Sequence, residues 1–232
     1  MSIEKIGDGI WVAEGRCVNF HSLPFPTRCV IVRLADGDIW VWSPTELTAE
    51  LQEAVRTLGT VRYLVSPNKI HHLFMGDWQK AFAGAELWGP ASTTKKRDDL
   101  GFTGTLDDGM PDAWHTDLAM AHMRGSFVMD ELVFFHKASR TTILADLSEN
   151  FSEDFLRANW KPWQRRLARL AGVVEGKAKT PLDWRFTFWR RDKARKTRDT
   201  ILGWPTKQVI MAHGTWQRTD GQAFLRKVFS WL

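Results

Sequence analysis

The sequence has very few cysteines and no long apolar run. Only Cys17 and Cys29 occur in 232 residues, and no CxxC spacing is present, which excludes a disulfide framework, a zinc ribbon and a dithiol redox pair. The longest uncharged apolar stretches, such as Leu132 to Phe135, have the length of strands, far below the roughly 20 residues that span a bilayer. The first residues, MSIEKIGDGIWV, lack the apolar core and cleavage site of a signal peptide. We therefore expect a cytoplasmic protein with no membrane partner.

Glycine and proline are not enriched, at 17 and 9 residues, and 44% of the chain is hydrophobic and 25% is charged. This composition excludes a disordered or collagen-like chain and predicts a folded protein with a sizeable core. The sequence contains no glycine-rich phosphate loop, no G-x-S-x-G and no G-x-G-x-x-G, so nucleotide-binding and serine-hydrolase functions have no support. The thirteen tryptophans are many for this length, and we expect most of them in the core.

Positive charge is concentrated in one segment, although the net charge of the whole chain is only +5. Residues 157–198 contain fourteen lysines and arginines against three acidic residues, with four tryptophans among them. One interpretation is a solvated helical face whose tryptophans pack inward, and the other is a surface that contacts phosphates or another anionic partner. No helix-turn-helix, zinc-finger or RNA-binding motif accompanies the segment, so we do not expect a nucleic-acid partner.

Strand patterns dominate the first half of the chain. Residues 10–15, 29–34 and 38–44 alternate as strands do, and Asp36-Gly37 predicts a hairpin between the last two. A helix with Leu51 and Val55 on its apolar face is expected after Thr48, followed by a buried strand over 61–67. A second helix over 74–82 and a short strand over 86–90 come next. We expect residues 91–112, which are polar and contain glycine, to form a surface excursion.

The second half repeats the succession of strands and helices. Strands are predicted over 117–123, 131–137 and 141–147, and again over 207–214. One long helix is predicted over 153–170, another over about 189–202, and a terminal one over 223–232. Two blocks of strands with helices fit a four-layer αββα sandwich, and they also fit a generic α/β or α+β domain.

Histidines lie where ligands gather in layered α/β proteins. His71 and His72 follow a buried strand, His122 and His213 close two others, and Asp146 ends a fourth. Because loops at the carboxyl ends of strands converge on ligands, we expect these side chains to share one site. Imidazole nitrogen and carboxylate oxygen suit zinc, iron or manganese.

The order of these segments resembles the metallo-β-lactamase superfamily over close to the whole chain. The resemblance rests on the HH pair after LVSP, then HMRGS, TTILADL and VIMAHG. FFHKASRTTILADL and VIMAHG resemble one branch of it, known only as a domain of unknown function, and we expect His136 in this stretch to make a structural bond to a neighbouring loop. The resemblance implies one domain over residues 1–232, with an α/β (α+β) fold, a four-layer αββα sandwich and a metal-binding cleft at its edge.

The first metal motif of that superfamily, HxHxDH, is altered in this chain. It corresponds to residues 67–72, where Pro67 and Lys69 replace the first two histidines and His71 stands at the aspartate position. His72 matches the last histidine of the motif. The metal position that depends on the missing histidines is therefore expected to be empty, which leaves at most a mononuclear site.

The other family positions are retained. His122 resembles the histidine of the third motif, Asp146 the bridging aspartate and His213 the final histidine. The resemblance thus implies His72, Asp146 and His213 as metal ligands. The alternatives for the cofactor are one zinc ion, iron or manganese in its place, or no metal.

Two functions from different classes remain open. The first is a mononuclear metal-dependent hydrolase in which a metal-activated water attacks an ester, thioester, lactone or phosphoester, and His71 or His122 orients that water or protonates the leaving group. The second is a non-catalytic relative whose degenerate cleft binds a small ligand or a protein partner, with residues 157–198 as an interaction surface. The lost histidine pair favours the second function, and the three retained ligand positions favour the first.

Overall fold

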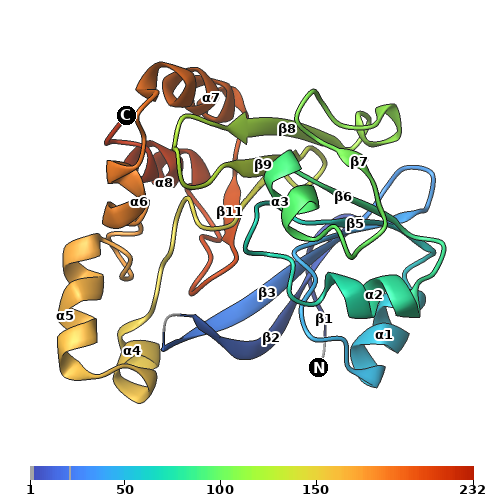
Figure 1. Cartoon of the computed structure of the whole chain (residues 1–232), viewed down its shortest axis with the longest axis horizontal. Coiled ribbons are helices and arrows are strands. Elements are labelled where there is room, and N and C mark those ends of the chain that lie inside the picture. The colour runs from blue at the N-terminus through green and yellow to red at the C-terminus, as the bar shows by residue number, and fades with distance from the viewer. Residues whose placement is uncertain (1–2, 21) are drawn as a thin grey trace. The chain divides into compact units, whose positions relative to one another are not determined.

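The computed structural model describes residues 3–20 and 22–232 (Figure 1). The chain divides into two compact units. The first unit contains the chain up to Arg16, Thr27–Met120 and His136–Ser139, and the second contains Cys17–Pro26, Ala121–Phe135 and Arg140–Leu232. The prediction of a single domain over the whole chain stays a prediction. Among the described residues, no helix combines the length and the apolar character that crossing a bilayer requires.

The sheet of the first unit follows the order of the sequence. In the described part of the chain it has seven strands in the order β1-β2-β3-β4-β5-β6-β7. They are β1 (Ile3–Gly7), β2 (Ile10–Phe20), β3 (Leu23–Arg33), β4 (Ile39–Trp42), β5 (Val61–Val65), β6 (Glu86–Gly89) and β7 (Phe102–Thr105). The parts of β2 and β3 that lie within Cys17–Pro26 belong to the second unit. β1 with β2 and β3 with β4 are antiparallel, and β4 to β7 are parallel. The predicted hairpin is confirmed, because Gly37, with a φ of 91°, donates its N–H to the Leu34 carbonyl at 2.9 Å.

The helices of this unit are short. They are α1 (Ala49–Arg56), α2 (Met75–Ala81), α3 (Ala91–Lys96) and a 3₁₀ turn at Asp112–Trp114. The helix predicted after Thr48 is confirmed, since the Thr48 hydroxyl accepts the Leu51 N–H at 3.2 Å and caps the first turn. Leu51 and Val55 are fully buried and join the core around Trp78. The amphipathic pattern therefore placed α1 on the sheet correctly.

The expectation of a surface excursion over residues 91–112 is wrong in part. α3 and β7 both lie within it. β7 is an edge strand in which partly buried and exposed residues alternate, so its sequence, Phe-Thr-Gly-Thr, looks polar although Phe102 packs against the core. The apolar content of one isolated edge strand is too low to stand out in the sequence.

The sheet of the second unit has the order β11-β10-β9-β8 in the part of the chain that the structure describes. Its strands are β8 (Leu118–Met123), β9 (Glu131–His136), β10 (Thr141–Leu144) and β11 (Gln208–Met211). The first three residues of β8 and the last residue of β9, His136, belong to the first unit. β10 and β11 are parallel and every residue of both is buried. The four strands predicted for this half of the chain are confirmed.

Five helices of the described chain belong to the second unit. They are α4 (Glu153–Asn159), α5 (Pro162–Ala171), α6 (Leu182–Phe186), α7 (Arg191–Gly203) and α8 (Gly221–Val228). The prediction of one helix over 153–170 is wrong, because the chain leaves the helical conformation at Trp160 and Lys161. Pro162 is the first residue of α5, and a proline disfavours a helical conformation of the residue before it. Trp160 is buried at the break and donates its indole N–H to the Pro24 carbonyl at 3.1 Å.

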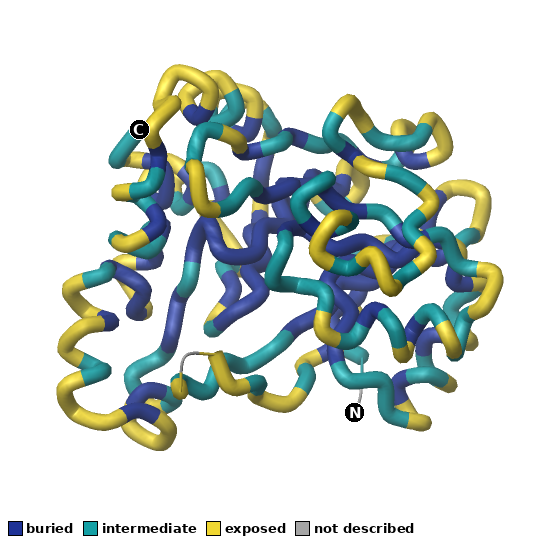
Figure 2. The backbone as a smooth tube through the Cα atoms, viewed as in Figure 1, coloured by how far each residue is buried: buried dark blue, intermediate teal, exposed yellow. Residues whose placement is uncertain are grey.

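Eight of the thirteen tryptophans are buried in the core, as predicted for most of them, three are partly buried and two are exposed. The buried ones are Trp11, Trp40, Trp42, Trp78, Trp114, Trp160, Trp184 and Trp216. Trp163 and Trp189 are exposed, and both lie in the basic segment. Figure 2 shows exposed residues along α5 and around the start of α7.

Candidate functional site

Asp146 and His213 meet at one edge of the second sheet. Asp146 follows β10 and His213 follows β11, and these strands are parallel neighbours, so their carboxyl ends lie side by side. Asp146 Oδ1 and His213 Nε2 are 3.3 Å apart, and the two residues are only 5% and 6% exposed. The sequence predicted that these two side chains would share a site, and within this unit they do.

A backbone carbonyl fixes the tautomer of His213. Its Nδ1 lies 2.6 Å from the Pro26 carbonyl oxygen, which can only accept, so Nδ1 carries a proton and donates it. In the neutral ring, Nε2 then presents its lone pair to Asp146. Burial opposes protonation of His213, but the hydrogen bond and charge of Asp146, with the charge of Glu149 and the Pro26 carbonyl, raise its pKa. The pair is therefore a buried anion and imidazole that attract a cation between them.

This donor set fits a divalent metal ion. A carboxylate oxygen and an imidazole Nε2 are common ligands of zinc, iron and manganese. A ligating histidine typically donates its other N–H to a carbonyl or carboxylate, as His213 does to Pro26. The Phe25 ring packs edge-on at 5.1 Å from the His213 ring and excludes solvent from one side of it.

Glu131 holds the backbone that carries Asp146, and the sequence analysis missed it. This fully buried carboxylate accepts the N–H groups of Ala145 and Asp146, each at 2.8 Å, and that of Leu147 at 3.3 Å. Charge-assisted hydrogen bonds to three consecutive amides fix the turn after β10. An acidic residue at the head of the otherwise apolar strand ELVFF was the available signal.

Gly214 allows the loop that carries His213 to approach the loop after Asp146. It has a φ of 81°, and a Cβ at this position would lie 2.2 Å from the Asn150 carbonyl oxygen. That oxygen accepts the Thr215 N–H at 2.8 Å, and the Asn150 side chain donates to the Thr215 carbonyl at 2.7 Å. The glycine of AHG is therefore required for the pairing of the two loops.

Glu149 is a second acidic residue that sequence reasoning missed. Burial raises the pKa of its carboxyl to about 8; His213 opposes this shift, whereas Asp146 adds to it. The carboxyl is therefore mostly protonated near neutral pH, and its position three residues after Asp146 in a loop gave no signal in the sequence.

His71 is held on two sides within the first unit. Its Nδ1 lies 2.7 Å from the Ser43 hydroxyl, and its ring stacks on Trp42 at 6.1 Å between centroids. Ser43 has a φ of 49° directly after β4, and its N–H donates to the Val65 carbonyl at 2.8 Å. Because a hydroxyl can accept as well as donate, Nδ1 of His71 can carry the proton and leave Nε2 as the basic nitrogen.

His72 is engaged differently from its neighbour. Arg97 Nη1 donates to His72 Nδ1 and to the His72 carbonyl, each at 3.0 Å. A guanidinium has no acceptor, so Nδ1 must accept, and the proton of the neutral ring sits on Nε2. Burial and the positive charges of Lys96 and Arg97 lower the pKa of His72 to about 4. In this arrangement neither ring nitrogen has a lone pair to give to a metal.

His122 forms a hydrogen-bonded chain in the second unit. Arg124 Nε donates to its Nδ1 at 3.0 Å, so its Nε2 carries a proton and donates to Asp130 Oδ2 at 2.6 Å. The Thr197 hydroxyl donates to the His122 carbonyl at 3.0 Å. The sequence analysis did not anticipate Asp130 or Arg124 as partners of this histidine.

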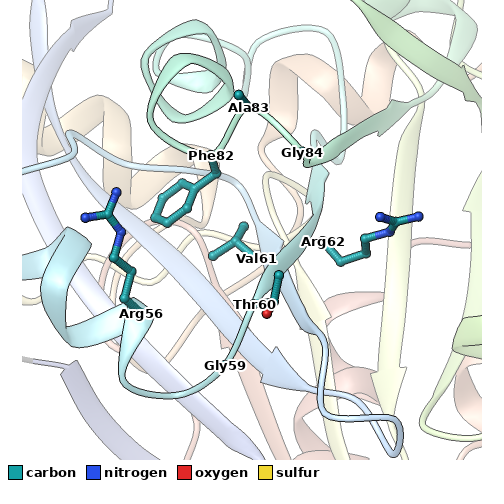
Figure 3. Close-up of a pocket in the computed structure, with 8 residues that line it drawn as sticks. All are labelled: Arg56, Gly59, Thr60, Val61, Arg62, Phe82, Ala83 and Gly84. Carbon is teal, nitrogen blue, oxygen red and sulfur yellow. The ribbon is translucent and has the colours of Figure 1, made fainter.

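Two cavities in the first unit lie away from the end of β5 that carries His71. One, of about 570 Å³, lies at the amino end of β5 and is lined by Arg56, residues 59–62 and residues 82–84 (Figure 3). Arg56 lies over the Phe82 ring at 5.6 Å, and Arg62 pairs with Glu86 at 3.1 Å. These pairings give both arginines a structural role.

The other cavity, of about 520 Å³, is lined in part by His136 and Asp117. His136 Nδ1 lies 2.7 Å from the Ser139 hydroxyl in the loop after β9, which is the kind of structural bond that we expected. Asp117 accepts the Ala35 N–H at 2.8 Å, so it too has a structural partner. Burial lowers the pKa of His136, against the opposing charges of Asp117 and Asp8.

Solved structures share this fold across nearly the whole chain. The metallo-β-lactamase from Hirschia baltica matches with a TM-score of 0.67 at 13% identity, covering 99% of this chain and 96% of that one. The metallo-β-lactamase from Pontibacter korlensis matches with a TM-score of 0.60 at 16% identity, covering 99% and 97%. The rubredoxin oxygen:oxidoreductase from Desulfovibrio gigas matches with a TM-score of 0.63 at 12% identity, covering 99% of this chain and 61% of that one.

These identities establish the fold and nothing finer. The chain has the metallo-β-lactamase fold, so the predicted resemblance and α/β fold class are confirmed. No curated protein matches the sequence. Residues 8–158 match the family described as Domain of unknown function (DUF4336), the kind of branch that FFHKASRTTILADL predicted. Because this match spans more than half of the sequence, the chain belongs to the DUF4336 family.

Proposed function

We propose that this protein is a mononuclear metal-dependent hydrolase that acts on an ester, thioester, lactone or phosphoester. The observation that carries the proposal is the buried pair of Asp146 and His213, with the His213 tautomer fixed by the Pro26 carbonyl. A bound divalent ion would polarise water or the reacting oxygen of the substrate. Zinc is our first choice, and iron and manganese, which accept the same donors, are the alternatives.

Two donors do not complete a catalytic metal site, which commonly has three protein ligands. The order of motifs in the superfamily assigns a further ligand to the HH pair, and the resemblance implies His72. The hydrogen bond from Arg97 argues against His72, because it occupies Nδ1 and leaves the proton on Nε2. His71 bonds a hydroxyl, which can accept its Nδ1–H, so the tautomer with the basic lone pair on Nε2 is compatible with its contact to Ser43. We therefore propose His71, rather than His72, as the metal-binding histidine of the HH pair, in place of the catalytic role predicted for it.

The other residues of this chain hold and orient the pair. Glu131 fixes the backbone of Asp146, and Pro26 fixes the ring of His213. His122 keeps its predicted role in positioning water or protonating the leaving group, and its Nε2 proton, shared with Asp130, is the one that it would transfer.

Metal content tests this proposal directly. Untagged protein prepared without chelator is analysed by inductively coupled plasma mass spectrometry, together with His71→Ala, His72→Ala and His213→Ala variants. We expect one equivalent of metal in the wild type and in His72→Ala, and loss in the other two. His115→Ala is the matched control, because the His115 side chain is exposed and its Nε2 bonds a backbone carbonyl, that of Met110, outside the proposed ligand set. A wild type that holds no metal even after incubation with zinc at neutral pH would refute the proposal.

A second candidate function is a non-catalytic relative that binds a small ligand or a protein. The observation that favours it is the loss of the first two histidines of the motif to Pro67 and Lys69. Hydrolysis assays with p-nitrophenyl esters, lactones and phosphodiesters separate the two candidates. Turnover that disappears in His213→Ala and on treatment with EDTA supports the enzyme, whereas bound metal without turnover of any of these substrates supports the binding protein.

A further inference from the structure

The basic segment of the second unit carries large apolar side chains that are exposed. On α5, Trp163, Leu167 and Leu170 are 58%, 54% and 74% exposed. They are spaced i, i+4 and i+7, so they form one stripe along the helix, which we call the α5 stripe. Ala168, on another side of α5, is buried and packs in the core. The stripe is therefore the outer face of a helix that is already anchored.

A second exposed group lies at the end of α6. Phe127, Phe186 and Trp189 are 74%, 75% and 83% exposed, and Val128 is 45% exposed; we call these four residues the aromatic cluster. Figure 1 shows α6 following α5 along the same side of the unit. Exposed apolar residues that occur singly need no explanation, but large groups of this kind mark interaction sites.

The backbone holds the aromatic cluster rigidly. The Phe127 N–H donates to the Thr187 carbonyl at 3.2 Å, and the Arg190 N–H donates to the Gly125 carbonyl at 2.9 Å. The Ser126 and Thr187 hydroxyls bond each other at 2.6 Å. A Cβ on Gly125, whose φ is 117°, would lie 2.3 Å from the Arg190 carbonyl oxygen, so the two segments are in close contact. The exposed rings therefore project from a fixed support.

Positive charge surrounds both groups. Residues 157–198 have an excess of eleven positive charges, and Arg166 and Arg191 are exposed beside the α5 stripe and the aromatic cluster. Arg169 and Arg190 pair with Glu153 and Asp192, which neutralises only part of this charge. A partner that fits this surface must therefore be negatively charged and must also bury apolar side chains.

We propose that the α5 stripe and the aromatic cluster dock onto an anionic lipid bilayer surface. A basic helix with Trp and Leu on its outer face has the composition of an interfacial helix, and anionic headgroups attract each nearby arginine. A second copy of the chain would bring the same positive charge against this surface, and a nucleic acid would leave the leucines in water. This inference departs from the sequence prediction of no membrane partner and does not depend on the proposed hydrolase activity.

Vesicle co-sedimentation tests the proposal. The probes are vesicles of phosphatidylcholine alone and of equimolar phosphatidylcholine and phosphatidylglycerol. We expect binding to the anionic vesicles only, weakened by salt. Phe186→Ser with Trp189→Ser, and separately Leu167→Ser with Leu170→Ser, should each weaken binding by about tenfold or more, since buried apolar area is lost. Arg191→Glu should weaken it by at least about fivefold.

Matched controls come from the first unit. Leu73→Ser removes a side chain that is 57% exposed, and Lys95→Glu reverses an exposed charge, and neither should change binding. Circular dichroism should show that every variant is folded. Equal binding to both vesicle types, or unchanged binding in either pair of apolar variants, would overturn the proposal. The proposal would also be overturned if the wild type does not bind vesicles but forms a dimer, and the Phe186→Ser/Trp189→Ser variant stays monomeric. A second copy of the chain would then be the occupant of this surface.

Discussion

Replacing Gly214 with alanine tests whether the loop that carries His213 depends on close backbone contact. The new Cβ would lie 2.2 Å from the Asn150 carbonyl oxygen, whereas ordinary contact begins at 3.4 Å, so the loops must separate by about 1 Å. The left-handed backbone at a φ of 81° costs a non-glycine residue about 1–2 kcal/mol. The displaced carbonyl also weakens its hydrogen bond with the Thr215 N–H, worth about 1 kcal/mol.

Together with the steric displacement, these effects predict a loss of about 3–4 kcal/mol in the free energy of unfolding. For a chain of this size the melting temperature should fall by about 6–16 °C. Differential scanning fluorimetry measures that shift, and the zinc affinity of the same variant should fall because His213 moves relative to Asp146. Gly203→Ala is the control, since no atom lies within 4 Å of a Cβ at the end of α7. A Gly214→Ala variant with the same melting temperature as Gly203→Ala and the wild type would refute the reasoning.

Three further predictions concern groups outside the metal ligands. Glu131→Gln puts a side-chain NH₂ group where backbone N–H groups already donate, so the free energy of unfolding measured in urea should fall by about 2–4 kcal/mol. A fall below about 0.5 kcal/mol would contradict this. Burial raises the pKa of the Cys29 thiol to about 11, so Ellman's reagent at pH 8 should titrate only the exposed Cys17 in folded protein and both thiols in denaturant. Thr48→Ala removes the cap of α1 and should cost about 1 kcal/mol in the same urea assay, with an unchanged m-value.

Elements with a strong local signal were predictable from the sequence. The turn at Asp36-Gly37, the cap at Thr48 and the apolar strands β9, β10 and β11 each have a pattern that few other structures satisfy. The errors occur where a local signal competes with tertiary structure. The apolar periodicity over 153–170 continues through the break, but Pro162 excludes a continuous helix there and Trp160 turns inward to reach Pro24. A proline inside an amphipathic pattern ends or kinks the helix even where the apolar periodicity continues.

The candidate site was predictable only as a set of positions. The pairing of Asp146 with His213 follows from two strand ends, because β10 and β11 are parallel neighbours. The residues that prepare this pair could not be found in the same way. Pro26 contributes a carbonyl rather than a side chain, and it precedes His213 by 187 positions. Any residue can supply a backbone carbonyl, so a sequence motif does not show which one is used.

The two neighbouring histidines illustrate what a motif match leaves out. By position in HxHxDH, His72 matches the last histidine of the motif, whereas His71 replaces its aspartate. Their hydrogen bonds favour the opposite assignment. Arg97 can only donate, so it occupies the Nδ1 lone pair of His72, whereas the Ser43 hydroxyl can accept the Nδ1 proton of His71. Both partners lie at least 25 residues away in the sequence, so only the fold brings them to the rings. The chemistry of a degenerate motif therefore depends on which lone pairs its neighbours leave available, and metal content in His71→Ala and His72→Ala measures that property directly.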